Sequence, residues 1–214
     1  PSELKADKDI EVCGKHKLLA EELIVGADKG IANVVVFVRG NDVKVNPAAK
    51  PTTPVVLDNK NCRFEPHVAV VQVGQELIIK NSDTAAHNSN VATLKNPPTN
   101  TLIQPGGESK VTFASEEALP AQVTCNVHPW MKGWIVVRAN PYVAVSKADG
   151  TFEIKDVPVG EVELQFYHEK AGYLGEMTIG GKPEKASKGR KKVNVAAGGT
   201  DLGEIVLAPA VFQK

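Results

Sequence analysis

Hydrophobic residues recur along the chain in short runs, and turn-forming residues separate the runs. The clearest runs are IANVVVFV, HVAVVQV, ELIIK and GWIVVR, which span 31–38, 67–73, 76–80 and 133–138. Short apolar or alternating runs between turn signals are typical of β-strands. No stretch sustains the 3.6-residue period of an amphipathic helix, and the best helical segment is the short one at 17–22. We therefore expect an all-β protein.

The composition supports the same class. The chain has 29 valines and 10 isoleucines against 13 leucines, and β-branched side chains favour strands over helices. Its 18 glycines and 14 prolines are enough to supply many turns. The strand pattern restarts after a shift near 138–141, so we expect a domain boundary there. We also expect a linker at 40–54, a long loop at 93–109 and a basic loop at 180–192.

The charge balance excludes some partners. The 25 basic and 25 acidic residues cancel, which argues against nucleic acid or an anionic membrane as the main partner. No run approaches the eighteen apolar residues of a membrane span, and the polar opening PSELKADKDI contains no export signal. The simplest interpretation of the basic loop is a solvent-exposed loop. The alternative is that its charges attract and orient an acidic partner. Its charged residues are Lys182, Lys185, Lys188, Arg190, Lys191 and Lys192.

The residues that indicate chemistry lie in the segment CNVHPWM. It places Cys125, His128 and Met131 within seven residues at the end of an expected strand. His87 follows the strand ELIIK and can approach from a neighbouring strand. A thiolate, two imidazoles and a weak thioether together describe a blue-copper site. We therefore expect one copper ion held by these four residues.

Each ligand alone has a simpler interpretation, because a lone buried cysteine or methionine usually packs in a core. Four suitable groups, three of them in a C-x-x-H-x-x-M pattern, favour copper over that interpretation. Zinc is less suitable, since its structural sites use cysteine and histidine without methionine. A dinuclear copper centre needs a second nearby cysteine, which the segment lacks.

Three segments resemble the cupredoxin family, and together they cover roughly 62–138. CNVHPWMKGWIVV resembles the ligand loop of amicyanin-type members, NSDTAAHNSNV the segment of the first histidine, and CRFEPHVAVVQVGQELIIKN the strands before it. The resemblance implies a Greek-key cupredoxin β-sandwich with a type 1 copper, one per chain. Its implied ligands are His87, Cys125, His128 and Met131.

Two neighbours of these ligands also enter through the resemblance. Asn88 corresponds to the residue whose backbone N–H usually donates to the cysteine sulfur. Amicyanin-type members have a proline directly before the second histidine, whereas this chain has Val127, which restores an N–H in the loop.

If Cys125 binds copper, Cys13 and Cys62 remain as a pair. An even remainder suggests a disulfide, and a disulfide suggests an oxidising compartment. We therefore expect a periplasmic or extracellular protein with a Cys13–Cys62 disulfide. The alternative is two unrelated buried thiols.

The segment after the boundary, YVAVSKADGTFEIKDVPVGEVELQFYHEKAGY, resembles the carboxypeptidase regulatory-like sandwich, a transthyretin-like module. GIANVVV at 30–36 fits the first strand of that family. The resemblance implies a second small β-sandwich made of 1–45 and 139–214, with the cupredoxin domain 46–138 inserted between them. The alternative places 1–61 in the cupredoxin barrel. Such modules serve packing or interaction, so this one implies no catalysis.

These expectations combine into a carrier of single electrons that is not an enzyme. We expect a redox partner protein to dock near Trp130 and His128, where the edge of the ligand would be reachable. A copper oxidase or nitrite reductase would need a further copper, and only the scattered His16, His67 and His168 remain. A copper carrier without a redox partner and a scaffold or interaction protein stay open as alternatives.

Overall fold

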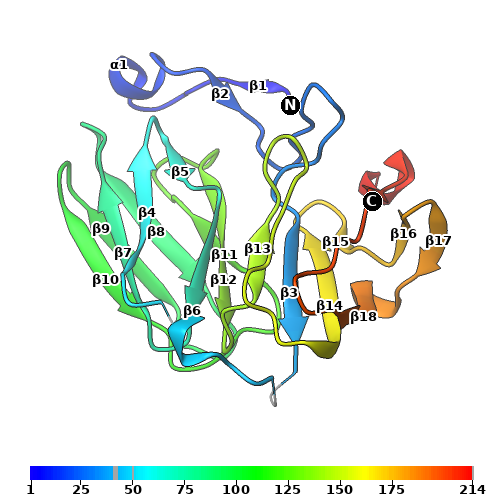
Figure 1. The fold of residues 1–214 in the computed structure, drawn as a ribbon. Helices are drawn as coiled ribbons and strands as arrows, with labels where there is room; N and C mark the ends of the chain where they lie inside the picture. Colours follow the sequence, from blue (N-terminus) through cyan, green and yellow to red (C-terminus); the bar gives the residue numbers. More distant parts are fainter. Residues whose placement is uncertain (41–42, 50, 214) are drawn as a thin grey trace. The chain divides into compact units, whose positions relative to one another are not determined.

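The computed structural model describes residues 1–40, 43–49 and 51–213. Within this part the fold is nearly all β, which confirms the expected class: the α-helix is the single turn α1 (Ile10–Cys13), and three short 3₁₀ turns accompany it. Those turns are η1 (Pro47–Ala49), η2 (Ser187–Gly189) and η3 (Pro209–Phe212). The chain divides into two compact units (Figure 1). The first unit contains Pro1–Glu21 and Pro51–Pro141, and the second contains Glu22–Lys50 and Tyr142–Lys214.

Two large sheets form the sandwich of the first unit (Figure 1). One sheet has the order β10–β7–β4–β5, with strands Glu108–Thr112, Glu76–Asn81, Val55–Lys60 and Arg63–Glu65. The other has the order β6–β12–β11–β8–β9, with strands Val68–Gln72, Lys132–Arg138, Ala121–Thr124, His87–Ala92 and Thr99–Ile103. The pairs β4–β7 and β6–β12 are parallel, and the other pairs are antiparallel.

Side chains from both sheets share one apolar core. Leu57 and Leu77 come from the first sheet, and Val91, Val123 and Ile135 come from the second, all of them fully buried. Two sheets that bury one face each against the other form a β-sandwich. This arrangement explains the alternating pattern of strands such as β7, in which buried and half-buried positions alternate.

The N-terminal arm, residues 1–21, belongs to the first unit. Its strands β1 (Glu3–Leu4) and β2 (Leu18–Leu19) pair with each other, and Leu18 packs into the core of the sandwich. A disulfide joins Cys13 of the arm to Cys62, as expected. The helix expected at 17–22 is wrong, because burying Leu18 and pairing with β1 stabilise an extended segment there.

The second unit also contains two sheets. In the larger sheet the order is β13–β3–β14–β15, with β18 pairing β14; the strands are Val143–Val145, Val35–Arg39, Gly160–His168, Gly172–Tyr173 and Arg190–Val195. The smaller sheet has the order β17–β16–β19, with strands Lys182–Lys185, Glu176–Ile179 and Ile205–Val206. Val36, Leu164 and Phe166 lie in the apolar core of the second unit.

The chain therefore enters the second unit before it builds most of the first. β3 pairs with both β13 and β14, although about a hundred residues separate them in sequence. The segment 1–45, expected to lie in one module, is divided between the two units at Glu21 and Glu22. The expected linker at 40–54 includes 41, 42 and 50, which lie outside the described residues.

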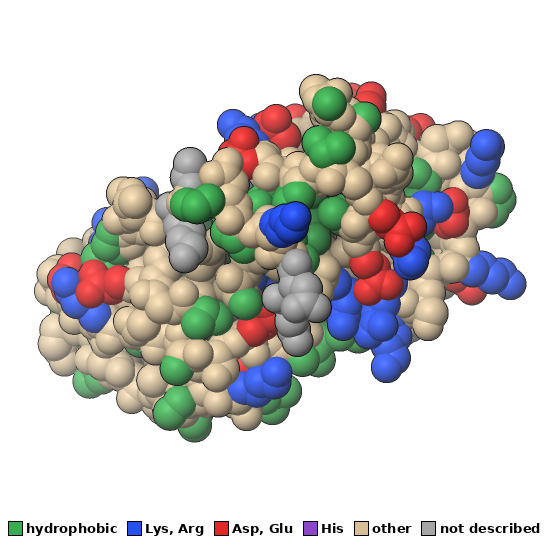
Figure 2. Space-filling view, turned by 60° about the horizontal axis from the view of Figure 1, so that its bottom comes forward, with side chains coloured by type: hydrophobic (Ala, Val, Ile, Leu, Met, Phe, Trp, Pro, Cys, Tyr) green, Lys and Arg blue, Asp and Glu red, His purple; other side chains and the backbone are tan. Residues whose placement is uncertain are grey.

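Three local expectations differ from the structure. The expected loop at 93–109 contains strand β9. The run TFEI at 151–154, whose alternating pattern predicts a strand, is irregular. The expected basic loop at 180–192 contains β17 and the start of β18, where Lys191 pairs with Glu184 and Lys192 pairs with Glu161. Charges of both signs also lie next to each other on the face shown in Figure 2. Such pairing reduces the net positive field that an acidic partner would meet. Among the described residues, no helix is long and apolar enough to cross a membrane.

Candidate metal centre

The candidate ligands lie at one edge of a sheet of the first unit, where β11 ends and its neighbours β8 and β12 begin. His87 is the first residue of β8, and Cys125 directly follows β11. The loop 125–131 leads from β11 into β12 and carries His128. β11 lies between β8 and β12, so Thr124 stands opposite a residue of each neighbour. This pairing brings the two segments that the sequence analysis singled out to the same edge.

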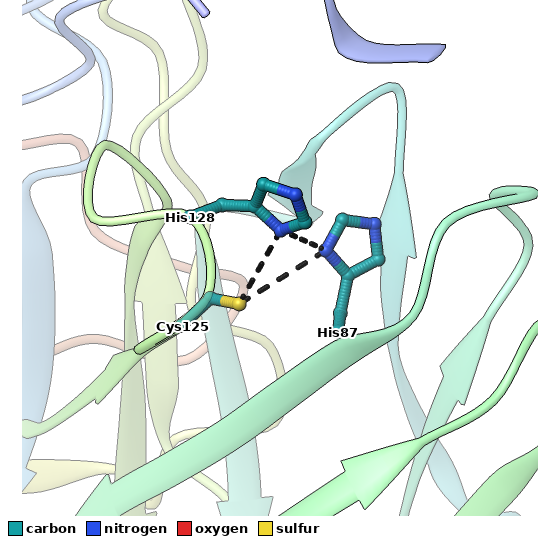
Figure 3. Close-up of side chains that lie close together, drawn as sticks. All are labelled: His87, Cys125 and His128. Carbon is teal, nitrogen blue, oxygen red and sulfur yellow. Dashed lines mark hydrogen bonds between the residues drawn. The ribbon is translucent and has the colours of Figure 1, made fainter. Parts of the chain in front are cut away.

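Three side-chain atoms converge there (Figure 3). His87 Nδ1 and His128 Nδ1 are 2.8 Å apart. Cys125 Sγ lies 3.6 Å from the His128 nitrogen and 4.0 Å from the His87 nitrogen. All three residues are buried, at 1% exposure or less, so water is largely excluded from the group.

The dimensions of this triangle fit a metal ion. A point inside it lies about 2.1 Å from all three atoms, and zinc bonds to nitrogen and sulfur measure about 2.0–2.3 Å. One thiolate and two imidazoles in a trigonal set are the donors of blue-copper sites. The residues therefore fit a copper ion in both type and spacing.

The outer nitrogen of each imidazole faces a carboxylate. His87 Nε2 lies 2.9 Å from Asp83 Oδ2, and His128 Nε2 lies 2.8 Å from Asp9 Oδ2. Asp83 is itself held by the backbone N–H groups of Asn61 and Cys62, which donate to its two oxygens. An ionised carboxylate only accepts hydrogen bonds, so both Nε2 atoms are donors.

That protonation state has a consequence at the inner nitrogens. When Nε2 of a neutral imidazole carries the proton, Nδ1 presents a lone pair. Two such lone pairs at 2.8 Å repel each other unless a proton or a metal ion lies between them. The inner face of the pair is therefore arranged to bind a cation.

Without a metal, a proton takes that place. Burial opposes a charged imidazole, but hydrogen bonds with Asp83 and Cys125 outweigh it and raise the pKa of His87 to about 9. Burial also opposes a thiolate, yet the contact with His87 and backbone N–H groups keep the pKa of Cys125 below its usual value. Burial and the nearby His87 lower the pKa of His128 despite Asp9. Metal binding must therefore displace a proton from His87.

Asn88 organises the ligand loop. Its Oδ1 accepts the backbone N–H of Asn126 at 2.7 Å and that of Val127 at 3.2 Å. The second of these is the N–H that a proline at 127 would lack. The backbone N–H of Asn88 is among the groups that lower the pKa of Cys125, in line with its expected contact with the sulfur.

Met131 is the fourth residue expected at the metal. It is buried in the core cluster of the first unit. Its backbone closes the ligand loop: its N–H donates to the His128 carbonyl, and its carbonyl accepts the N–H of Cys125. Its role as a weak ligand stays a prediction.

The expected docking edge is not exposed. His128 is fully buried, because Asp9 covers its outer nitrogen and the Trp130 ring lies 5.1 Å from its ring. Trp130 is half-buried, and its indole N–H donates to the Cys62 carbonyl. A partner therefore cannot reach the imidazole of His128 directly in this conformation, contrary to the expected route.

The remaining histidines lie outside the group. His67 faces Glu21 at 3.6 Å, and His168 accepts the backbone N–H of Lys170. His16 is half-buried near Cys13 in the arm. A second cluster of possible ligands, Cys62 with Asp83 and His87, offers no thiolate because Cys62 is in the disulfide.

Two functional residues were missed by the sequence analysis. Asp83 stands four residues before His87, so the D-x-x-x-H spacing was a usable signal. Asp9 lies 119 residues before His128, and no local pattern connects them.

No protein-family model matches the chain. No curated protein matches it either.

Three solved structures match this chain over less than half of its length. A Cu-containing nitrite reductase from Thermus scotoductus SA-01 is 26% identical over 44% of this chain and 27% of its own, with a TM-score of 0.37. A purple cupredoxin from Nitrosopumilus maritimus is 20% identical over 40% of this chain and 98% of its own, with a TM-score of 0.33. Amicyanin from Paracoccus versutus is 19% identical over 48% of this chain and 96% of its own, with a TM-score of 0.35.

Proposed function

We propose that this protein binds one type 1 copper ion through His87, Cys125 and His128, with Met131 as a weak fourth ligand, and carries single electrons. The observation that supports it most is the buried triangle of one sulfur and two Nδ1 atoms, each imidazole backed by a carboxylate. Copper supplies the redox chemistry when bound, by alternating between Cu(II) and Cu(I).

The chain's own residues would hold the site in one arrangement during that change. Cys125 provides the thiolate, and the hydrogen bonds of Asn88 keep the loop that carries it in place. Asp83 orients His87, and backbone N–H groups fix Asp83 in turn. Ligands held this way move little between oxidation states, which favours fast electron transfer.

A copper carrier without a redox partner is the second candidate. The covered edge of His128 favours it, because electrons have no exposed imidazole through which to leave. The two functions differ in their redox behaviour. A reversible one-electron potential and exchange with a protein partner support electron transfer, whereas tight copper binding without such exchange supports the carrier.

The decisive experiment adds Cu(II) to the metal-free protein and records the visible spectrum. We expect one copper per chain and an intense thiolate-to-copper band that Cys125→Ser removes. His16→Ala is the matched control, since it removes a histidine outside the group, and it should keep the band. Unchanged absorption in Cys125→Ser would sink the assignment.

We further propose an exported protein, because the Cys13–Cys62 disulfide persists best in an oxidising compartment. We also propose that 139–214, together with strand β3, forms a carboxypeptidase regulatory-like module. Its role would be packing or interaction, and no role in catalysis is assigned to it.

A further inference from the structure

The contact between Asp9 and His128 joins the N-terminal arm to the candidate metal centre. Asp9 Oδ2 lies 2.8 Å from His128 Nε2, and the imidazole beneath it is fully buried. The Asp9 side chain itself is about half exposed, at 47%. The arm therefore supplies the outer partner of one ligand from the surface.

The arm holds this carboxylate in a defined place. Asp9 has a left-handed backbone (φ 46°) at the start of α1, and its carbonyl accepts the N–H groups of Val12 and Cys13. The disulfide then fixes Cys13 to Cys62, whose carbonyl accepts the Trp130 indole N–H. These links attach the turn that carries Asp9 to the same part of the sandwich as the ligand loop.

The chemical effect of the contact is on His128. The carboxylate accepts the Nε2 proton and so leaves the Nδ1 lone pair directed at Cys125 and His87. Asp83 does the same for His87 from within its own strand–loop segment. Carboxylates behind metal-binding histidines orient the ring and increase its basicity.

We propose that Asp9 is a positioning residue for the metal centre: through its hydrogen bond with Nε2 of His128, the N-terminal arm sets the orientation in which that imidazole binds metal. The inference rests on the proposed metal site, and it adds a residue outside the segments that resemble the cupredoxin family. The arm is then part of the site rather than a terminal extension.

The test compares Asp9→Gly with Asp9→Asn, Asp9→Glu and the control Asp7→Asn. Glycine removes the carboxylate and tolerates the left-handed backbone, and asparagine keeps an acceptor but loses the charge. Asp7 is an exposed acidic residue of the same arm. Two measurements are made on each variant: the Nε2–H proton signal of His128 by NMR in the metal-free protein, and the affinity for Co(II).

We expect Asp9→Gly to lose the hydrogen bond from His128 Nε2–H to a carboxylate, seen as an upfield shift and faster exchange of that proton, and to weaken Co(II) binding by about 10–100-fold. Asp9→Asn should weaken Co(II) binding less than Asp9→Gly does, and Asp9→Glu should retain part of the affinity that Asp9→Gly loses. Asp7→Asn should bind Co(II) as tightly as the unaltered protein. The same Nε2–H signal and the same affinity in Asp9→Gly and Asp7→Asn would overturn the proposal.

The two proposals fail in different ways. Absence of metal binding in the unaltered protein contradicts the proposed function. The NMR measurement needs no metal, so a His128 Nε2–H signal that is independent of Asp9 overturns the positioning role on its own. Tryptophan fluorescence of each variant confirms that the first unit remains folded, because Trp130 and Trp134 both lie in it.

Discussion

The two units bury different kinds of side chain. In the first unit many polar side chains are buried, including Asn59, Asn81, Asp83 and Glu117 in addition to the candidate ligands. Among the described residues of the second unit, the buried polar side chains are Ser146, Gln165 and His168. Both units have an apolar core, so apolar packing alone does not distinguish them.

The difference indicates where the chemistry is concentrated. A buried polar group costs stability unless it is hydrogen-bonded, so a cluster of them needs precise partners. In the first unit one set of those partners surrounds a candidate ligand: Asn81 accepts the N–H of Asp83, and Asp83 faces His87. Glu117 instead accepts the backbone N–H groups of the segment 94–96. In the second unit the polar groups join strands, as when Gln165 accepts a hydrogen bond from Arg39. We therefore expect changes in the second unit to leave the metal centre unaltered.

The largest expected effects come from removing one aromatic core residue in each unit. Phe113→Ala and Phe166→Ala should each lower the stability of its own unit by about 3–5 kcal/mol, because both side chains are about 1% exposed. Urea unfolding can follow the units separately, since both tryptophans lie in the first unit and all three tyrosines in the second. Phe166→Ala should shift only the tyrosine signal and leave the copper spectrum intact. A loss of the copper band in Phe166→Ala would break the comparison.

Removal of the disulfide should be slightly less costly. The double variant Cys13→Ser, Cys62→Ser opens a link between residues 49 apart, and loops of that size contribute about 3–4 kcal/mol. We expect the tryptophan transition to move to lower urea and the tyrosine transition to stay. Thiol titration of the unfolded, metal-free, non-reduced protein should find one free thiol, that of Cys125. Three thiols would contradict both the pairing and the inferred compartment.

Metal affinity should depend on pH through His87. Its pKa is raised to about 9, so below that value a proton must leave when a metal binds. The apparent Zn(II) affinity should therefore rise about tenfold per pH unit between about pH 6 and about pH 8 and level off above about pH 9. Calorimetry in two buffers measures the released proton directly. An affinity that does not change over this range would show that His87 is not protonated in the metal-free protein.

The smallest effect should come from Met131→Gln. The oxygen donor of glutamine favours Cu(II) more than a thioether does, so the reduction potential should fall. The shift equals about 59 mV for each tenfold change in the ratio of Cu(II) to Cu(I) affinity. Copper should stay bound, since His87, Cys125 and His128 remain. The variant Met131→Leu removes the sulfur without adding an oxygen donor, so it separates the two effects on the potential. A potential that is the same in all three proteins would show that Met131 only packs in the core.

The sequence pattern was sufficient to predict the class of fold and the proximity of Cys125 to His128. Alternation predicted strands such as β7, and the C-x-x-H spacing placed Cys125 and His128 in one short loop. Connectivity alone keeps residues three apart close together, and strand pairing then brings His87 to them. The interpretations of 151–154 as a strand and of 180–192 as a loop were wrong. Whether a short segment forms a strand depends on the neighbour with which it pairs, and the local pattern does not identify that neighbour.

By itself, then, the sequence determined an all-β protein with a thiolate and two imidazoles suited to copper. Only the tertiary structure decided that the N-terminal arm joins the first unit, that β3 joins the second, and that Asp9 covers His128. The reason is physical. Local spacing restricts nearby residues directly, whereas a contact between residues 119 apart exists only because one global packing of the chain is more stable than its competitors.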